Sequence, residues 1–159
     1  MDKINRIKNC INNYKIAVLI PTYNNCSTIK KVINDVQKYI QNIIVINDGS
    51  TDSTIEILQS IRGIELISFQ RNCGKGCALK AGIKRAYELN YSHVITFDSD
   101  GQHIAVDIPQ LIEKIYEEPD VLWVGNRTLP YDKGYAPPRR SSFGRKFGRF
   151  WYKFNTGIA

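Results

Sequence analysis

The chain has 159 residues, of which 43% are hydrophobic and 23% are charged, and this composition is typical of a folded domain and excludes a disordered chain. No apolar run approaches the ~18 residues that a membrane-spanning helix requires, and the N-terminus lacks the apolar core of a signal peptide, so we expect a cytoplasmic protein. The four cysteines lack CxxC spacing, so we expect neither a zinc site nor disulfides. The net charge is +7, and the whole excess lies after residue 125, where eight Lys or Arg accompany one acid.

Continuous apolar runs recur along the chain and are separated by stretches with helical spacing. Runs without alternation are typical of strands that are buried on both faces. In chain order we expect a helix at 2–14, a strand at 15–20, a helix at 27–40, a strand at 43–46, a helix at 51–61, a strand at 64–69, a helix at 74–89, a strand at 93–97, a helix at 108–117 and a strand at 121–124. Pro21 is expected to stop the first strand, Ser27 to cap the next helix, and Thr51 or Asp52 to cap the one after it. The alternation predicts an α/β fold with a mostly parallel, Rossmann-like sheet and helices on both faces.

Polar groups follow these strands at the point where each strand ends. In parallel sheets, ligands bind in the crevice beyond the carboxyl ends of the strands. The groups are Thr22-Tyr23-Asn24, Asp48-Gly49-Ser50, Arg71-Asn72, Asp98-Ser99-Asp100 and Asn126-Arg127. Five loops that converge on one edge of a sheet predict a binding site there.

Asp98 and Asp100 stand one residue apart directly after the fourth apolar run. Carboxylates are costly to bury unless they are paired or bound to a cation, and an Asp-x-Asp sequence can offer two hard oxygen ligands to one Mg²⁺ or Mn²⁺. Such an ion usually takes its other ligands from water and substrate phosphates, which indicates a phosphate-bearing substrate. Asp and Ser next to Gly are also common turn residues, so the motif alone leaves a turn role open.

The segment Asn72-Cys73-Gly74-Lys75-Gly76 places backbone N–H groups and a lysine at a predicted helix N-terminus, which suits an anion. It lacks the GxxxxGK[ST] pattern of a P-loop. Tight packing of a helix on a strand is the alternative reason for Gly74 and Gly76.

The alternation of strands and helices stops after Arg127. Three prolines and a glycine predict a mobile loop over 128–138, and a final helix follows, with an aromatic face flanked by Arg145, Lys146, Arg149 and Lys153. We therefore divide the chain into an α/β domain, 1–127, and a loop with a basic aromatic helix, 128–159. The aromatic face can pack on a core or lie on an anionic membrane, and both remain open.

The ordered motifs Pro21-Thr22-Tyr23-Asn24, Asn47-Asp48-Gly49-Ser50-Thr51-Asp52, Asn72-x-Gly74-Lys75-Gly76 and Asp98-Ser99-Asp100-Gly101-Gln102-His103 resemble those of family 2 glycosyltransferases with the GT-A fold. The branch that they resemble is the dolichyl-phosphate mannose synthase-like one, which transfers sugars to polyprenyl phosphate. The resemblance implies that the nucleotide is bound by Pro21, Thr22, Tyr23, Asn24, Asp48, Lys75 and Asp98, and that Mg²⁺ or Mn²⁺ is held by Asp98, Asp100 and Gln102. It also implies catalytic roles for Asp100 and Arg127 and an acceptor-phosphate contact for Arg139 and Arg140. For His103 we favour a loop role, because Mg²⁺ prefers oxygen ligands.

The resemblance implies an inverting, metal-dependent enzyme that moves a sugar from a UDP- or GDP-linked donor to a polyprenyl phosphate or a saccharide. We assign no general base; Asp107 is a poor candidate, and an ionised phosphate acceptor would need none. The family continues beyond the aromatic helix, so we expect a truncated chain with an incomplete acceptor side. The enzyme is expected in the cytoplasm, with a possible peripheral contact at the inner face of the membrane.

A second hypothesis is a nucleotide-sensing binding module that docks on a membrane or on nucleic acid through the basic aromatic tail. The apolar residues of that tail keep one helical face, which suits a membrane or a core better than a nucleic-acid groove. We therefore expect no nucleic-acid partner.

Overall fold

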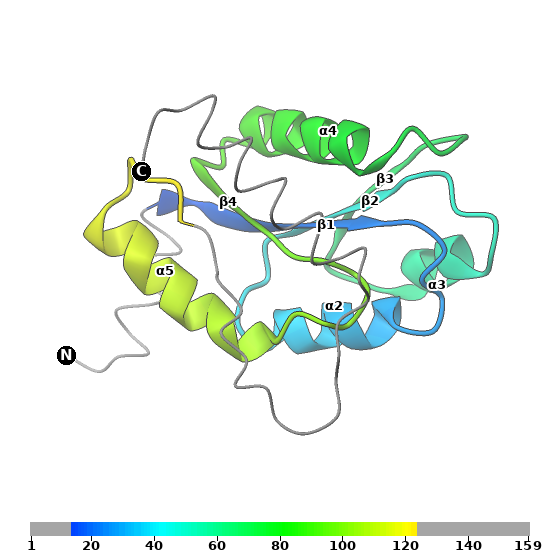
Figure 1. Ribbon diagram of the computed structural model, residues 1–159, viewed down its shortest axis with the longest axis horizontal. Coiled ribbons are helices and arrows are strands. Elements are labelled where there is room, and N and C mark those ends of the chain that lie inside the picture. The colour runs from blue at the N-terminus through cyan, green and yellow to red at the C-terminus, as the bar shows by residue number, and fades with distance from the viewer. Residues whose placement is uncertain (1–13, 124–159) are drawn as a thin grey trace, which may run out of the picture. The chain divides into compact units, whose positions relative to one another are not determined.

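The structure, a computed structural model, describes residues 14–123 (Figure 1). Its elements are β1 (Ile16–Thr22), α2 (Ile29–Gln37), β2 (Ile43–Asn47), α3 (Thr54–Ser60), β3 (Glu65–Ser68), α4 (Lys75–Glu88), β4 (His93–Thr96), the short 3-10 helix η1 (Ala105–Asp107) and α5 (Ile108–Glu117). The four strands are parallel and lie in the order β3-β2-β1-β4. The predicted α/β fold is confirmed, whereas the expected helix at 2–14, apart from its last residue, and the whole segment after 123 lie outside the described residues.

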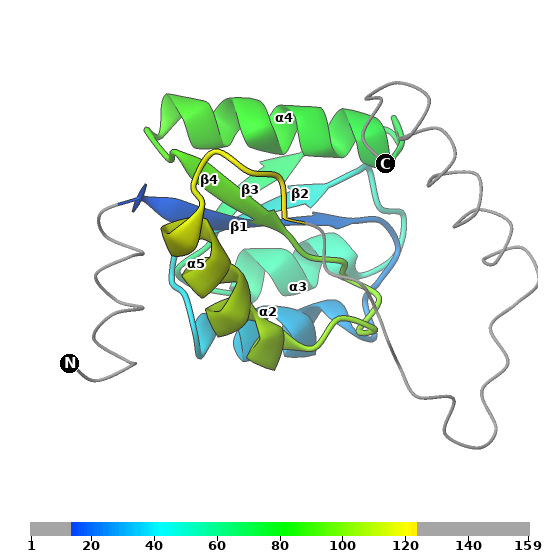
Figure 2. The same ribbon diagram turned by 60° about the vertical axis from the view of Figure 1, so that its left-hand side comes forward.

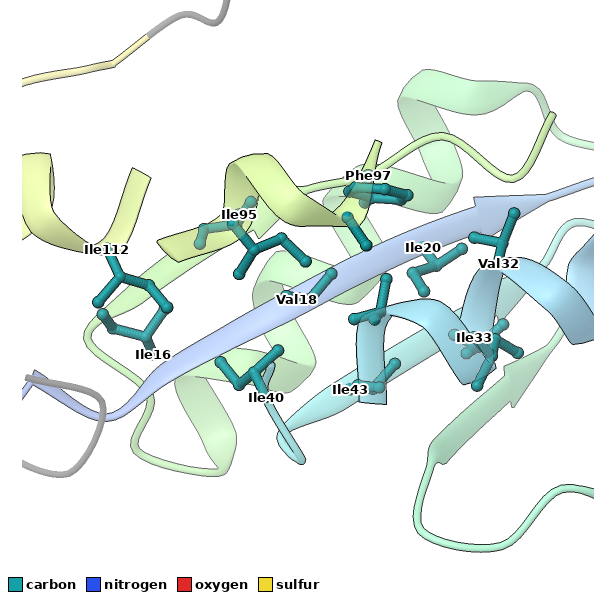
Figure 3. Packing of buried hydrophobic residues seen from close by; sticks show 14 of the residues in the cluster. Ile16, Val18, Ile20, Val32, Ile33, Ile40, Ile43, Ile95, Phe97 and Ile112 are labelled. Atoms are coloured by element: carbon teal, nitrogen blue, oxygen red, sulfur yellow. The ribbon is translucent and has the colours of Figure 1, made fainter. Parts of the chain in front are cut away.

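Helices cover both faces of the sheet: α4 lies on one face, and α2, α3 and α5 lie on the other (Figures 1 and 2). Side chains of β1 alternate between the two faces, because successive residues of a strand point to opposite sides. Ile16, Val18 and Ile20 join the core with α2 and α5 (Figure 3), whereas Ala17 and Leu19 join the smaller core under α4. This double coverage is the reason why β1 reads as one unbroken apolar run.

Pro21 does not stop β1, so that prediction is wrong. Pro21 pairs with Ile46 in the parallel ladder of β1 and β2. Proline has no N–H to donate, so it is tolerated in a strand only where no ladder bond is lost. On its other side β1 pairs with β4 only as far as Leu19, opposite Thr96. Beyond that point the Pro21 carbonyl accepts a hydrogen bond from Ser99 Oγ (3.0 Å) instead of one from the backbone of β4. The backbone of Pro21 therefore faces the side on which β4 has already ended, and no ladder bond is lost.

The starts of two helices differ in detail from the expectation. The residue before α2 is Thr28 and not Ser27, and its hydroxyl donates to the Ser99 carbonyl (2.7 Å) instead of capping the helix. The residue before α3 is Ser53, while the Asp52 carboxylate accepts the Thr54 N–H (3.0 Å). Asp52 therefore holds the first turn of α3 from one position further out.

Residues 121–123 form a bend and irregular chain, so the described part of the expected fifth strand is not a strand. The chain turns at the end of α5, where the Val121 N–H and Trp123 Nε1 both donate to the Glu118 carbonyl (3.4 and 3.3 Å). The Lys114 ammonium also lies 5.4 Å from the centre of the Trp123 ring. These contacts hold the segment against α5.

The strand order places β1 between β2 and β4, so the chain leaves β1 in one direction and later returns on its other side. The crevice beyond the carboxyl ends of β1 and β4 is the topological switch point at which open α/β sheets bind ligands. Within residues 14–123, no helix combines the length and the apolar character needed to span a membrane.

Candidate functional site

The loop after β4 is anchored through its middle residue. Ser99 is buried; its hydroxyl donates to the Pro21 carbonyl (3.0 Å), and its own carbonyl accepts from Thr28 Oγ1 (2.7 Å). The neighbouring Asp98 is half-buried and Asp100 is exposed. The structure therefore fixes the centre of the Asp-x-Asp sequence in the protein and leaves both acids at the carboxyl edge of the sheet.

Asp100 also serves as a turn residue. Its Oδ1 accepts the Gln102 N–H (2.9 Å), and Gly101 adopts φ +78°, the left-handed conformation that favours glycine. Asp100 therefore has the turn role that the sequence left open. This role uses only one oxygen of an exposed carboxylate, so Asp100 can also act as a metal ligand.

Asp98 lies between two basic side chains. Its Oδ1 is 2.6 Å from Lys75 Nζ at the start of α4, and its Oδ2 is 3.7 Å from His103 Nε2. The backbone N–H of Asp98 donates to His103 Nδ1 (3.0 Å), which in a neutral ring places the proton on Nε2, facing the carboxylate. The His103 ring also packs edge-on against Phe97, with 5.1 Å between centroids. These contacts hold the His103 ring within the loop, and the loop role that we favoured for it stays a prediction.

Asp48 is buried below the loop that joins β3 to α4. Its Oδ1 accepts the Cys73 N–H and its Oδ2 accepts the Gly74 N–H, both at 2.8 Å. Hydrogen bonds to an ionised acceptor are strong, so this carboxylate fastens the loop to the end of β2. The contact of Asp48 with base or ribose stays a prediction, which would use the lone pairs that remain on its oxygens.

This arrangement changes the expected anion site at the start of α4. The N–H groups of Cys73 and Gly74 are already taken by Asp48, so the Lys75 side chain is the cationic group that the segment presents. A Cβ at Gly74 or Gly76 would have no neighbour within 4 Å, so tight packing does not explain these glycines. Gly74 has φ +90°, which explains its identity by backbone conformation.

The loop after β1 is tied to the loop after β2. The Asn24 N–H donates to Ser50 Oγ (3.0 Å), and Asn24 Oδ1 accepts the Thr51 N–H (2.8 Å). Thr22 is buried, whereas Tyr23 is exposed beside it. Of the residues expected near the nucleotide in this loop, Pro21 and Thr22 are buried, whereas Tyr23 and Asn24 are exposed. Asn24 also holds the two loops together.

Asn25 was not singled out by sequence reasoning. Its N–H donates to Thr54 Oγ1 (3.1 Å), and its side-chain amide donates to the Tyr23 carbonyl and to Ser99 Oγ (both 3.0 Å). Asn25 therefore links the ends of β1 and β4 to the start of α3. The only sequence signal was a further polar residue in a strand-end loop.

Asp52, two residues before α3, supports the same part of the site. It accepts the N–H of Thr54 (3.0 Å), the first residue of α3, and that of Cys26 (3.2 Å) in the loop before α2. The hydrogen bond with the Thr54 side-chain hydroxyl is the main reason why the pKa of Asp52 is lowered from 3.8 to about 2. The ionised carboxylate thus joins the start of α3 to the loop that precedes α2.

The described residues fit a divalent ion that is completed by its substrate. Within residues 14–123, no group of three or more His, Cys, Asp or Glu could by itself hold a metal. Asp98 and Asp100 offer hard oxygen donors on one anchored loop, with Gln102 exposed two residues further on. Mg²⁺ and Mn²⁺ sites with few protein carboxylates use water and substrate phosphates for the rest. The predicted residues Arg127, Arg139 and Arg140 lie outside the described residues.

A parallel sheet with helices on both faces, and an anchored Asp-x-Asp loop at its switch point, defines an α/β domain with a candidate ligand site beyond the strand ends. Residues 17–159 match the sequence profile of "Glycosyl transferase family 2", and the chain belongs to that family. The domain has the GT-A fold.

Two curated relatives carry the names of enzymes that act on N-acetylglucosamine. The chain is 34% identical over 129 residues to the UDP-N-acetylglucosamine–dolichyl-phosphate N-acetylglucosaminyltransferase of Methanococcus voltae, and this match covers 70% of the chain and 51% of that protein. It is 37% identical over 91 residues to the poly-beta-1,6-N-acetyl-D-glucosamine synthase of Staphylococcus aureus, covering 54% of the chain and 21% of that protein. The chain thus spans about half the length of the first relative and less of the second.

The fold is shared with glucosyl-3-phosphoglycerate synthase from Mycobacterium tuberculosis, solved with Mn²⁺, UDP-glucose and phosphoglyceric acid. The two chains are 23% identical with a TM-score of 0.58, over 70% of this chain and 43% of that one. At this identity the likeness concerns the fold alone.

Proposed function

We propose that the chain binds the donor in a metal-dependent, inverting glycosyltransferase that moves a sugar from a nucleotide diphosphate to an acceptor. The observation that carries this proposal is the anchored Asp98-Ser99-Asp100 loop at the switch point of the sheet. Burial of Ser99 holds the two flanking carboxylates in place before any ligand arrives, and such preorganisation favours binding of a charged donor.

For the donor we propose a UDP-linked sugar rather than a GDP-linked one. The named donor of the Methanococcus relative is UDP-N-acetylglucosamine, and the mycobacterial enzyme that shares the fold was solved with UDP-glucose. The nucleotide would lie over the loop after β1, beside the exposed Tyr23, with Pro21, Thr22 and Asn24 shaping the floor. Asp48 would act there chiefly by holding the loop that carries Lys75.

The divalent ion would be held by Asp98 and Asp100, with Gln102 as a further oxygen donor. When bound, such an ion supplies positive charge that offsets the charge developing on the leaving diphosphate. The Lys75 ammonium, at the start of α4, would also offset the charge on the leaving diphosphate. Arg127, which the family resemblance makes a phosphate contact, is the second candidate for this task.

For the acceptor we propose a polyprenyl phosphate. A phosphate acceptor is already ionised and needs no general base, whereas a sugar hydroxyl needs a carboxylate within hydrogen-bond reach. Asp107 is exposed at the end of η1, directly before α5, and its side chain makes no capping hydrogen bond to that helix. Arg139 and Arg140 would contact the acceptor phosphate, which would place the enzyme at the inner face of a membrane.

The test is calorimetric titration of the 159-residue chain with UDP, GDP and their sugars, with and without Mn²⁺. Asp100→Asn should weaken the metal-dependent part of nucleotide binding by at least about tenfold, since even outer-shell changes at metal sites cost that much. The melting temperature should stay nearly unchanged, because Asp100 is exposed. The matched control is Asp35→Asn, which removes an acid of α2 that pairs with Lys31 and with Lys38, the residue after the helix.

Unchanged nucleotide affinity in Asp100→Asn would refute the metal assignment. If no nucleotide binds the folded wild-type chain under any condition, the donor-binding role fails, and only the docking part of the binding-module hypothesis remains.

A further inference from the structure

Asp98, one of the two acids of the candidate metal site, already carries a cation from the protein itself. Lys75 Nζ lies 2.6 Å from its Oδ1, a contact between residues 23 positions apart in the sequence. The other oxygen is approached by a histidine nitrogen at 3.7 Å. The ammonium therefore contacts one of the two oxygens through which Asp98 could bind a metal ion.

The position of Lys75 is set by buried groups rather than by a loose surface chain. Gly74, directly before it, donates its N–H to the buried Asp48 at 2.8 Å, and Cys73 does the same to the other oxygen. Gly74 also starts α4 with a left-handed φ of +90°. The backbone of Lys75 is thus fastened to the end of β2, and its side chain reaches from there to the loop after β4.

We propose that Lys75 is a placeholder for the divalent ion on Asp98 and that it moves to the donor diphosphate when metal and nucleotide bind together. This inference rests on the proposed function. A divalent ion on Asp98 would repel the ammonium at contact distance, because both carry positive charge. This repulsion favours movement of Lys75 to another anion, and the diphosphate is the anion that enters the same site.

The exchange couples the two ligands. Without nucleotide, Lys75 competes for Asp98 and lowers the affinity for the metal. With nucleotide, Lys75 gains a partner on the diphosphate and no longer opposes metal binding. Because linkage is reciprocal, each ligand should raise the affinity for the other by the same factor.

The size of the effect follows from the exposure of the pair. The Lys75 side chain is 61% exposed and that of Asp98 is 31% exposed. Exposed ion pairs are weak, so removing the lysine should raise metal affinity by about twofold to fivefold and no more. A change of this size is measurable by titration of free Mn²⁺.

The experiment uses Lys75→Gln in the full 159-residue chain. In the absence of nucleotide the variant should bind Mn²⁺ about twofold to fivefold more tightly than wild type. At saturating Mn²⁺ it should bind UDP more weakly. Lys75→Arg should keep the low metal affinity of wild type, because the cation is retained. Lys80→Gln removes the same charge from an exposed position of the same helix and should leave Mn²⁺ affinity unchanged.

Any of three outcomes would overturn the inference. The first is that Lys75→Gln binds Mn²⁺ no more tightly than wild type, and the second is that Lys80→Gln binds Mn²⁺ as tightly as Lys75→Gln does. The third is that Lys75→Gln keeps the full wild-type affinity for UDP. A wild-type chain that binds Mn²⁺ neither alone nor with UDP would instead refute the proposed function, and the inference with it. Loss of Mn²⁺ binding in Asp98→Asn, with tighter binding in Lys75→Gln, would support both.

Discussion

Gly49 lies where the loops after β2 and β3 touch, and its replacement by alanine is a direct test of that contact. Gly49 has φ +68°, and a Cβ at this position would stand 2.3 Å from the Arg71 carbonyl carbon and 2.6 Å from the Asn72 nitrogen. Both are backbone atoms, so no side chain can swing away to make room. The alanine would push the loop after β3 away from the end of β2, where Asp48 holds it.

The expected cost has two parts. Alanine in the left-handed region costs about 1–2 kcal/mol. If the loop moves, both hydrogen bonds to the Asp48 carboxylate are lost, at about 1.5–3 kcal/mol each for bonds to a charged group. Gly49→Ala should therefore destabilise the protein by about 4–8 kcal/mol, against a total of about 5–15 kcal/mol for a typical domain.

The assay is urea denaturation followed by circular dichroism, with Gly63→Ala as the matched control. Gly63 has φ +76°, but its Cβ would meet only the Gln37 side-chain nitrogen at 3.6 Å, an ordinary contact. Gly63→Ala should thus lose about 1–2 kcal/mol, the conformational part alone. If the two variants lose the same free energy of unfolding, the two loops do not approach each other as closely as the structure indicates.

Two further predictions concern the polar contacts around the site. The pKa of Asp52 is lowered from 3.8 to about 2 in the folded protein, so its contribution to stability is present above about pH 4 and is lost as the pH falls toward 2. The difference in unfolding free energy between wild type and Asp52→Asn should therefore decrease as the pH falls from about 4 to about 2. A difference that is independent of pH would contradict the lowered pKa of Asp52. Thr28→Val keeps the shape but removes the donor to the Ser99 carbonyl, so it should cost about 1 kcal/mol and also weaken Mn²⁺ binding. Unaltered Mn²⁺ binding in a destabilised Thr28→Val would show that this bond supports the fold but does not position the acids.

The parts of the fold that the sequence predicted are those that depend on local burial. A central strand such as β1 is covered on both faces, so every residue from Ile16 to Ile20 is apolar and the strand is visible as an unbroken run. The helices were predicted from the spacing of their apolar residues, as in α2, where Ile29, Val32, Ile33 and Val36 are buried. In both cases the pattern lies within a few consecutive residues.

Other features depended on where a neighbouring segment ends. Pro21 could remain in β1 because β4 leaves the ladder after Thr96, and no local property of Pro21 carries that information. Residues 121–123 have the composition of a strand, but their hydrogen bonds to the Glu118 carbonyl hold them at the end of α5. Strand propensity yields to tertiary contacts in such cases.

For the candidate site, the sequence by itself determined which polar residues stand at the carboxyl ends of the strands, because each follows directly on an apolar run. Only the tertiary structure decided how those residues pair. Asp48 with Gly74, Lys75 with Asp98 and Asn25 with Ser99 are separated by 26, 23 and 74 positions. The physical reason is that a hydrogen bond or ion pair requires atoms within about 3 Å, and this distance is set by strand order and loop path rather than by spacing along the chain.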